Sequence, residues 1–343
     1  MSGCVFRRLG FRFVSPAGVE SVSYCEAPPR SSFTMRTRLR SAAVVIACSL
    51  LLGQCGGSGP SSPTTPPGGG GGGGGNPGDG SGSGNAGPAT VLAAGDIGEC
   101  GFGAHETGEI LDRLPGTLLA LGDLAYMHGN VANFRDCYDP AWGRHLGRTR
   151  PVPGNHEYET PGASTYYDYF GSVAGIQGAG YYAFTAGSWR VIALNSEIPM
   201  GPGSPQMQWL RNELEANRTA CTLAYWHRPL FSSGPNGNNP DTRPFWRTLM
   251  EFRAEVVLNG HDHMYERFGP QDADGRADGA TGIRQFIAGT GGAHLYAPEA
   301  AKPNSEIRAR TYGILMLTLT TNSYRWEFVS NTAFRESGSG VCH

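Results

Sequence analysis

The sequence predicts an α/β fold built on one mixed sheet or on two packed sheets, and three observations lead to this prediction. From Thr90 onward, short apolar runs alternate with stretches in which apolar residues recur at helical spacing. Later in the chain, pairs of apolar runs are joined by short turns, as in antiparallel hairpins. Strands separated by helices imply a parallel core, to which the late hairpins add antiparallel pairs. We find no internal repeat.

The predicted strands are short, and most of them end in Gly, Pro or a polar loop. In chain order they are 91–94, 118–121, a segment reaching 153, a hairpin over 181–195, 222–226, 256–258, 283–288, 314–320 and 324–329. Three amphipathic segments are predicted as helices: 105–114, 206–216 and 244–252. Ser204 is the expected cap of the second helix, with Pro205 at its first position.

Composition divides the 343 residues into a long N-terminal region and one folded domain over 89–343. Segment 56–88 is almost wholly Gly, Pro, Ser, Thr and Asn, so it has nothing to bury and is expected to be a flexible tether. Segment 35–55 has a basic start followed by an apolar run too short to span a bilayer, which predicts a signal peptide. Because a signal peptide starts at the initiator Met, we expect residues 1–34 to be a mis-called extension.

Cys55 is a candidate lipid-anchor site. Leu52-Gly53-Gln54-Cys55 resembles a bacterial lipobox, in which the cysteine becomes the lipidated first residue of the mature chain. Gln54 departs from the small residue expected at its position, so secretion without a lipid is the alternative. The domain is therefore expected to be exported, as a cell-surface or periplasmic lipoprotein or as a secreted protein.

Charge argues against a nucleic-acid partner. Residues 1–55 hold seven arginines and two glutamates, so the rest of the chain carries 20 basic and 27 acidic residues. A domain with a formal charge of −7 is poorly suited to binding a phosphate backbone. We predict no binding to nucleic acid.

Four cysteines follow the tether, and their even number in an exported domain predicts disulfides. None of their spacings fits a zinc–thiolate site. Four thiols allow three pairings. We favour Cys100–Cys137, both in loops after early strands, with Cys221–Cys342 tying down the C-terminus.

Acidic, amide and imidazole side chains recur where the apolar strands end: at Asp96, Asp123, Asn155, His227, His261 and His263. Each one alone is ordinary turn chemistry. The carboxyl ends of strands in an open α/β sheet, however, gather at one edge, where ligands bind. Together with the phenol of Tyr126, these side chains could serve two metal ions. Two metals roughly 3.5–4 Å apart form a clamp for the oxygens in phosphoryl transfer, and a phenolate favours Fe(III) over zinc.

Five ordered blocks resemble the calcineurin-like metallophosphoesterases. They are Asp96-Ile97-Gly98, Gly122-Asp123-Leu124-Ala125-Tyr126, Gly154-Asn155-His156-Glu157, Ala224-Tyr225-Trp226-His227 and Gly260-His261-Asp262-His263. The tyrosine of the second block narrows the resemblance to the purple acid phosphatase branch. The resemblance implies a four-layer α/β/β/α sandwich of two mixed sheets.

The resemblance also implies a role for each residue. A ferric ion would be held by Asp96, Tyr126 and His263. A divalent partner, Zn, Mn or Fe, would be held by Asn155, His227 and His261. Asp123 would bridge the two ions, and His156 would bind the phosphate or protonate the leaving group.

Other residues near the blocks are candidates for supporting roles. Glu157, Arg228 and Arg267 are candidates for orienting the ligands, and His294 is a candidate to reach the site. Members of the family often have another histidine in the loop after the fourth block. Here segment 235–239 is Pro-Asn-Gly-Asn-Asn, which leaves the substrate preference open.

The leading prediction is an exported phosphatase, a phosphoric ester hydrolase, with a small phosphorylated substrate. It would hydrolyse phosphomonoesters by in-line attack of a metal-bound hydroxide. A phosphodiesterase or nucleotidase on the same centre is the first alternative, because substrate choice depends on variable loops. A non-catalytic surface domain with structural metals is the second.

Overall fold

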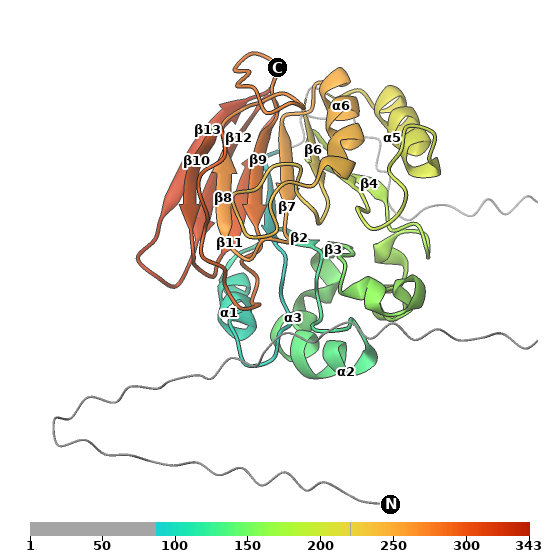
Figure 1. The fold of residues 1–343 in the computed structure, drawn as a ribbon, viewed down its shortest axis with the longest axis vertical. Helices are drawn as coiled ribbons and strands as arrows, with labels where there is room; N and C mark the ends of the chain where they lie inside the picture. The colour runs from blue at the N-terminus through green and yellow to red at the C-terminus, as the bar shows by residue number, and fades with distance from the viewer. Residues whose placement is uncertain (1–86, 220) are drawn as a thin grey trace, which may run out of the picture. The chain divides into compact units, whose positions relative to one another are not determined.

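The computed structural model describes residues 87–219 and 221–343, which form two mixed sheets with helices on their outer faces (Figure 1). One sheet has the order β13-β12-β11-β1-β2-β3, and the other has the order β10-β8-β9-β7-β6-β5-β4. The first consists of β1 (Ala89–Ala94), β2 (Thr117–Leu121), β3 (Thr149–Val152), β11 (Ile314–Leu319), β12 (Ser323–Val329) and β13 (Glu336–Val341). The second consists of β4 (Tyr182–Ala186), β5 (Trp189–Ala193), β6 (Thr222–Tyr225), β7 (Val256–Asn259), β8 (Tyr265–Phe268), β9 (Arg284–Ala288) and β10 (Ser305–Ala309).

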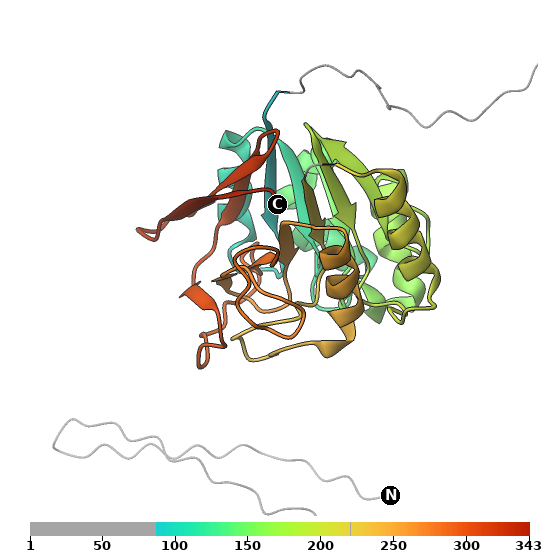
Figure 2. The ribbon, with the colours of Figure 1, turned by 90° about the horizontal axis from the view of Figure 1, so that it is seen from above.

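Each sheet combines parallel and antiparallel pairs, and β3 is a parallel edge strand of the first sheet. Strands β1, β2 and β3 run parallel, and so do β5, β6, β7 and β9. The C-terminal strands, red in Figure 2, extend the first sheet through antiparallel pairs from β11 to β13. The hairpin of β4 and β5 ends the second sheet, as the pattern over 181–195 predicted.

Alternating side chains bury both faces of the sheets. In β2, Leu119 and Leu121 point between the two sheets, whereas Leu118 and Ala120 point to the outer face. Side chains of a strand alternate in this way, so a strand that is apolar at every position must be covered on both sides. The inner core also takes Leu223 from β6, so the two sheets pack directly on each other.

Helices cover the two outer faces. They are α1 (Ala104–Arg113), α2 (Val131–Asn133), α3 (Asp139–Trp142), α4 (Ser164–Phe170), α5 (Pro205–Ala216) and α6 (Arg243–Glu251). Buried residues of α1, α3 and α4 pack on the first sheet, and those of α5 and α6 pack on the second. The layers are therefore α/β/β/α, and the predicted four-layer sandwich is confirmed.

The predicted helices and most of the predicted strands are present within a few residues of their expected bounds. Ser204 Oγ accepts a hydrogen bond from Met207 N at 3.3 Å, so the predicted cap of α5 is confirmed. Strands β8, β10 and β13 and helices α2 to α4 had not been predicted. The sequence of β13, Glu-Ser-Gly-Ser-Gly-Val, has no strand-like apolar pattern, and its pairing with β12 is what makes it a strand.

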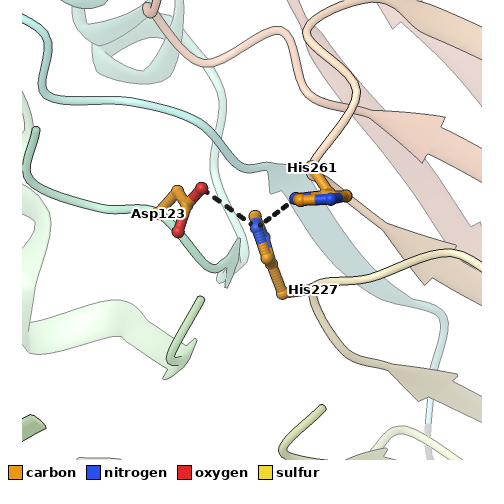
Figure 3. Close-up of side chains that lie close together, drawn as sticks. All are labelled: Asp123, His227 and His261. Atoms are coloured by element: carbon orange, nitrogen blue, oxygen red, sulfur yellow. Dashed lines mark hydrogen bonds and ion pairs between the residues drawn. The ribbon is translucent and has the colours of Figure 1, made fainter. Parts of the chain in front are cut away.

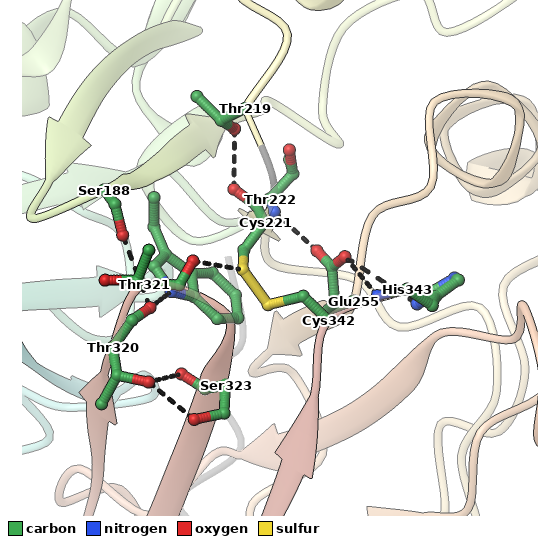
Figure 4. Close-up of a disulfide and its surroundings, with 11 residues drawn as sticks. Ser188, Thr219, Cys221, Thr222, Glu255, Thr320, Thr321, Ser323, Cys342 and His343 are labelled. Carbon is green, nitrogen blue, oxygen red and sulfur yellow. Dashed lines mark hydrogen bonds and ion pairs between the residues drawn. A yellow bond between two sulfur atoms is a disulfide. The ribbon is translucent and has the colours of Figure 1, made fainter.

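Two disulfides link the four cysteines of the described part, Cys100–Cys137 and Cys221–Cys342, and this confirms the favoured pairing. Figure 4 shows the second of them. Within this part, no helix combines the length and the apolar composition needed to cross a bilayer. The expectations for residues 1–86, which include the signal peptide, Cys55 and most of the tether, lie outside the described residues.

Candidate metal centre

The ligand candidates lie at the carboxyl ends of parallel strands from both sheets. β1 and β2 lead to Asp96 and Asp123, and β6 and β7 lead to His227 and His261. The hydrogen-bond ladder continues past the strands, because Asp96 N donates to Gly122 O at 2.9 Å. Bonds also cross between the sheets, and in one of them His261 N donates to Asp96 Oδ2 at 2.8 Å. The four loops are thus held together at one edge of the sandwich, as expected for this class of fold.

Three ligand candidates have left-handed backbone conformations, with φ of 58° at Asp96, 49° at Asp123 and 74° at His261. Such values are uncommon in residues other than glycine, and they cluster at functional sites. Glycines next to these turns allow the carboxylates of Asp96 and Asp123 to lie close to the backbone. A Cβ on Gly154 would lie 2.3 Å from Asp123 Oδ1, and one on Gly260 would lie 2.6 Å from Asp96 Oδ2.

One group of candidates, which we call the tyrosine-side group, consists of Asp96, Tyr126 and His263. Tyr126 Oη lies 3.0 Å from Asp96 Oδ1 and 3.0 Å from His263 Nε2. The third separation, from His263 Nε2 to Asp96 Oδ1, is 3.3 Å. Separations of this size are typical of neighbouring ligands bonded to one metal at about 2 Å.

The second group of candidates, which we call the histidine-side group, is His227 and His261 together with Asn155, which the resemblance assigns to it. His227 Nε2 lies 3.2 Å from His261 Nδ1 and 3.0 Å from Asp123 Oδ2 (Figure 3). The ligand atoms of Asp123, His227 and His261 all lie within 4.8 Å of one another. The Oδ1 atom of Asn155 is buried and has no hydrogen-bond partner.

Asp123 lies between the two groups. Its Oδ2 atom is 3.3 Å from Tyr126 Oη and 3.0 Å from His227 Nε2. Its Oδ1 atom accepts a hydrogen bond from His156 N at 2.9 Å. A carboxylate that faces both groups is suited to bridge two cations.

The imidazole rings are oriented by backbone carbonyls behind them. His227 Nδ1 lies 2.9 Å from Leu121 O, and His263 Nδ1 lies 2.8 Å from His294 O. Each Nδ1 must therefore carry the proton, which leaves the Nε2 lone pair directed at a carboxylate. Lone pairs and carboxylate oxygens that face each other at about 3 Å repel unless a cation or a proton lies between them.

The pKa values show the same demand for positive charge. Burial lowers the pKa of His227, but the carboxylate of Asp123 outweighs burial and raises it to about 10. Burial, followed by the charges of Asp123 and Asp96, raises the pKa of Tyr126 well above its ordinary value. Burial and the neighbouring His227 lower the pKa of His261 to about 3. Together with the unpartnered Asn155 Oδ1, this set of donors fits two hard or borderline cations.

Glu157 braces the loops that carry the ligands. Its side chain is buried, and its carboxylate accepts hydrogen bonds from Leu124 N at 2.8 Å, Ala125 N at 3.2 Å and Gly154 N at 2.8 Å. These groups belong to the loops after β2 and β3. The prediction that Glu157 orients ligands therefore has a physical basis, because one carboxylate fixes two ligand loops together.

His156 lies beside the centre without being part of either group. Its Nδ1 atom is hydrogen-bonded to Met127 O, and its Nε2 atom lies 3.8 Å from Asp123 Oδ2. The side chain is one-fifth exposed, so the ring reaches solvent. This position suits a group that meets an incoming ligand.

Several other polar residues have structural roles. Arg267 pairs with Glu336 at 2.9 Å and lies against Trp326. The imidazole of His294 pairs with Glu99, and only its backbone carbonyl supports the centre. Asp262 is buried, and its carboxylate accepts hydrogen bonds from Ser232 Oγ and Asn236 N, away from both ligand groups.

Two contacts at the centre had not been predicted. Tyr296 stacks on the ring of His263 with centroids 4.1 Å apart. Glu197 holds Arg228, whose guanidinium reaches His261. Glu197 follows β5 by a few residues, so the strand-end signal that identified the ligands could also have identified it.

Comparison with known proteins places the chain among phosphoesterases. The calcineurin-like phosphoesterase family model matches residues 89–265. Purple acid phosphatase 15 of Arabidopsis thaliana is 24% identical over 217 residues, which cover 52% of this chain and 41% of that protein. An uncharacterized protein of Mycobacterium tuberculosis is 31% identical over 182 residues, which cover 43% of this chain and 34% of that protein. The chain thus spans less than half the length of these relatives.

Solved structures show the same fold. A purple acid phosphatase from yellow lupin (Lupinus luteus) seeds matches with a TM-score of 0.60 at 16% identity, covering 74% of this chain and 53% of that one. GAP50, the anchor in the inner membrane complex of Plasmodium, matches with a TM-score of 0.57 at 14% identity, covering 73% and 88%.

Because the family model matches more than half of its length, the chain belongs to the calcineurin-like phosphoesterase family. Within that family, its similarity is to the purple acid phosphatase branch. The resemblance predicted from the five sequence blocks is confirmed.

Proposed function

We propose that this protein is a phosphoric ester hydrolase that acts on phosphomonoesters at a dinuclear metal centre. One observation carries the proposal: acceptor atoms from both sheets converge around Asp123, with lone pairs facing carboxylates and with Asn155 Oδ1 buried without a partner. Such an arrangement is electrostatically costly unless cations are bound. Membership of the phosphoesterase family supports the choice of reaction.

Each group of side chains is suited to one cation. The tyrosine-side group, which contains a phenol, suits Fe(III), and the histidine-side group suits Zn, Mn or Fe as a divalent ion. Asp123 would bridge them. Bound there, two cations would polarise the phosphoryl group and lower the pKa of a coordinated water.

His156 is the side chain best placed to meet the substrate. The hydrogen bond of Nδ1 to Met127 O fixes the ring, and Nε2 faces the centre near Asp123. Because Nδ1 holds its proton against Met127 O, Nε2 carries a proton only in the imidazolium form, and in that form Nε2–H can donate to a phosphoryl oxygen or to the oxygen of the leaving alcohol. We assign it the role of proton donor.

The proposal includes export of the domain. The predicted signal segment 35–55 supports export, and so do two disulfides, which persist in oxidising compartments. Lipidation at Cys55 would then attach the domain to a membrane through the tether.

Metal analysis combined with a visible spectrum of the purified domain tests the centre. We expect two metal atoms per chain, one of them iron, and a visible tyrosinate–iron band that disappears in Tyr126→Phe. A colourless protein with only zinc or manganese would refute the iron assignment and leave the phosphoesterase proposal standing.

Rates on a monoester, a diester and a nucleotide test the substrate class. The monoester is expected to be the fastest. Faster cleavage of the diester or the nucleotide would favour a phosphodiesterase or nucleotidase on the same centre. If the metal-loaded protein cleaves none of the three, a non-catalytic metal-binding domain becomes the better explanation.

A further inference from the structure

Arg228 follows His227 directly and points back toward the centre. Its backbone N donates to Ser196 Oγ at 3.1 Å, and its Nε donates to the two carboxylate oxygens of Glu197 at 2.9 and 3.1 Å. The guanidinium is thereby fixed on one side by Glu197. Its Nη1 atom, on the other side, lies 3.2 Å from His261 Nε2.

When a cation occupies Nδ1 of His261, the contact between Arg228 and His261 Nε2 lacks an acceptor. His261 Nδ1 faces His227 Nε2 at 3.2 Å, so Nδ1 is the atom turned toward the metal group. A neutral imidazole that binds a cation through Nδ1 carries its proton on Nε2, and a guanidinium has donors only. Two N–H donors then lie side by side, and an oxygen that accepts from both would satisfy them. An anionic phosphoryl oxygen is the strongest such acceptor in a phosphoesterase.

Glu197 lies in a loop that is fixed on both sides. Its backbone N donates to Asn195 Oδ1 at 2.9 Å, and its carboxylate accepts from Ser196 Oγ at 2.9 Å. Asn195 is in turn held by Gln206 of α5 through bonds of 2.7 and 2.9 Å. The side chain of Glu197 is only one-tenth exposed. Arg228 is therefore held in place before any ligand arrives, which lowers the entropy cost of binding one.

A hollow of about 550 Å³ adjoins this pair and is lined by the loop 196–201 and the start of the segment that leads into α6. Its lining is about equally polar and apolar, and its apolar members include Ile198, Pro199, Met200 and Pro240. Its acidic members are Glu197, which Arg228 neutralises, and Asp241. Among the described residues that line it, none is basic. We call it the Glu197 hollow.

We propose that Arg228 and the Glu197 hollow form the substrate-binding side of the centre. Arg228 holds one phosphoryl oxygen together with His261 Nε2–H. The hollow receives the alcohol of the ester, and the charge of Asp241 selects an alcohol without negative charge. This inference rests on the proposed function. It specifies the substrate class as phosphomonoesters of uncharged or cationic alcohols.

Calorimetric titration of inorganic phosphate into the metal-loaded protein tests Arg228. In Arg228→Met we expect the Kd for phosphate to rise roughly tenfold or more, because a charge-assisted hydrogen bond is lost. Arg228→Lys keeps the charge but not the geometry, so it should recover part of the affinity. Both metals should remain bound in both variants, as checked by metal analysis.

Arg190→Met is the matched control. Arg190 pairs with Glu213 and is buried to a similar degree, but it lies at the start of β5, the strand whose far end leads to Glu197. The Kd for phosphate should not change in this variant. An unchanged Kd in Arg228→Met, or the absence of phosphate binding by the parent protein, would overturn the assignment. Loss of metal from both Arg228 variants would also overturn it, since Arg228 would then act by supporting His261.

Phosphate binding requires no turnover, so the titration tests the role of Arg228 whether or not the protein hydrolyses esters. A parent protein that binds phosphate through Arg228 but cleaves no ester would refute the enzyme proposal alone.

Paired esters test the hollow. Phenyl phosphate and 4-carboxyphenyl phosphate differ by one negative charge, and we expect kcat/KM to favour the first by about tenfold. Asp241→Asn should narrow this ratio. As a control, Asp168→Asn, which replaces an exposed residue of α4, should leave the ratio of the two rates unchanged. Equal rates on the two esters in the parent protein, or a ratio that Asp241→Asn does not change, would overturn the role of the hollow.

Discussion

The two ends of strand β6 are built on opposite principles. At its start, Cys221 is bonded to Cys342, and the buried carboxylate of Glu255 accepts from Thr222 N at 2.6 Å (Figure 4). At its end, His227 points Nε2 at a carboxylate oxygen of Asp123 across 3.0 Å, and a proton or a cation must lie between them. One end is closed by a covalent bond between segments 121 residues apart, and the other is stable only with added positive charge.

This difference shows how the fold divides its tasks. Repulsion between the acceptor groups at the metal end lowers the stability of the folded chain, and interactions elsewhere in the structure must offset that loss. A disulfide that closes a long loop restricts the unfolded chain and is suited to this task. We therefore expect changes at the metal end to affect chemistry first and changes at the disulfide end to affect stability first.

Asp123→Asn should give the largest effect. Removing the carboxylate that both groups share is expected to reduce the metal content below two per chain and the activity at least about a thousandfold. Metal analysis and initial rates check this, with Asp168→Asn as the control. Full activity with two metals bound would mean that Asp123 does not bridge.

Replacing both Cys221 and Cys342 by serine should lower the free energy of unfolding by about 2–4 kcal/mol. Urea unfolding monitored by circular dichroism measures the loss. With the protein folded, kcat on a monoester should stay within about twofold of the parent value, because the disulfide lies at the other end of β6 from the centre. A large fall in kcat would show that the two ends are coupled.

Glu157→Gln tests the brace at the metal end. Glutamine offers one acceptor oxygen and a donor in place of the second oxygen, so one of the backbone N–H groups held by Glu157 loses its acceptor. We expect metal affinity or activity to fall about 10–100-fold, measured by competition with a chelator and by initial rates. Glu159→Gln, in the same turn, is the control. If the two variants have the same metal affinity and activity, Glu157 does not support the ligand loops.

Glu255 makes the stability of the disulfide end depend on pH. Burial raises the pKa of Glu255 from 4.5 to about 7. The folded protein therefore holds this proton more tightly than the unfolded chain. The resulting stability is complete below about pH 4.5 and is lost as the pH rises through about 7, with a slope of at most about 1.4 kcal/mol per pH unit.

Glu255→Gln should remove this part of the pH dependence, as measured by urea unfolding between pH 4.5 and 8. His343 Nδ1, 3.8 Å from the carboxylate, is the other titratable group in contact with it, so His343→Gln separates the two contributions. A pH profile that Glu255→Gln leaves unaltered would contradict the prediction.

The sequence predicted the layers and pointed to the ligand candidates because both have local signals. Leu118 to Leu121 are apolar at every position, which requires cover on both faces, and the candidates lie within a few residues of the ends of strands. Contacts between distant segments had no such signal. Glu197 and Arg228 are 31 residues apart, and neither residue type alone indicates the other. β13 is a strand because β12 offers it an edge, and its Gly-Ser sequence gives no pattern to detect.

The hydrogen bond from His261 N to Asp96 Oδ2 joins a histidine-side ligand to a tyrosine-side ligand through the backbone. In the proposed centre, a cation that draws Asp96 into position would also act, through this bond, on the turn that aims the His261 ring. The first ion to bind would then prepare the ligands for the second, and metal uptake should be cooperative. Partly loaded protein would then be a mixture of empty and full chains, with few chains that hold one ion.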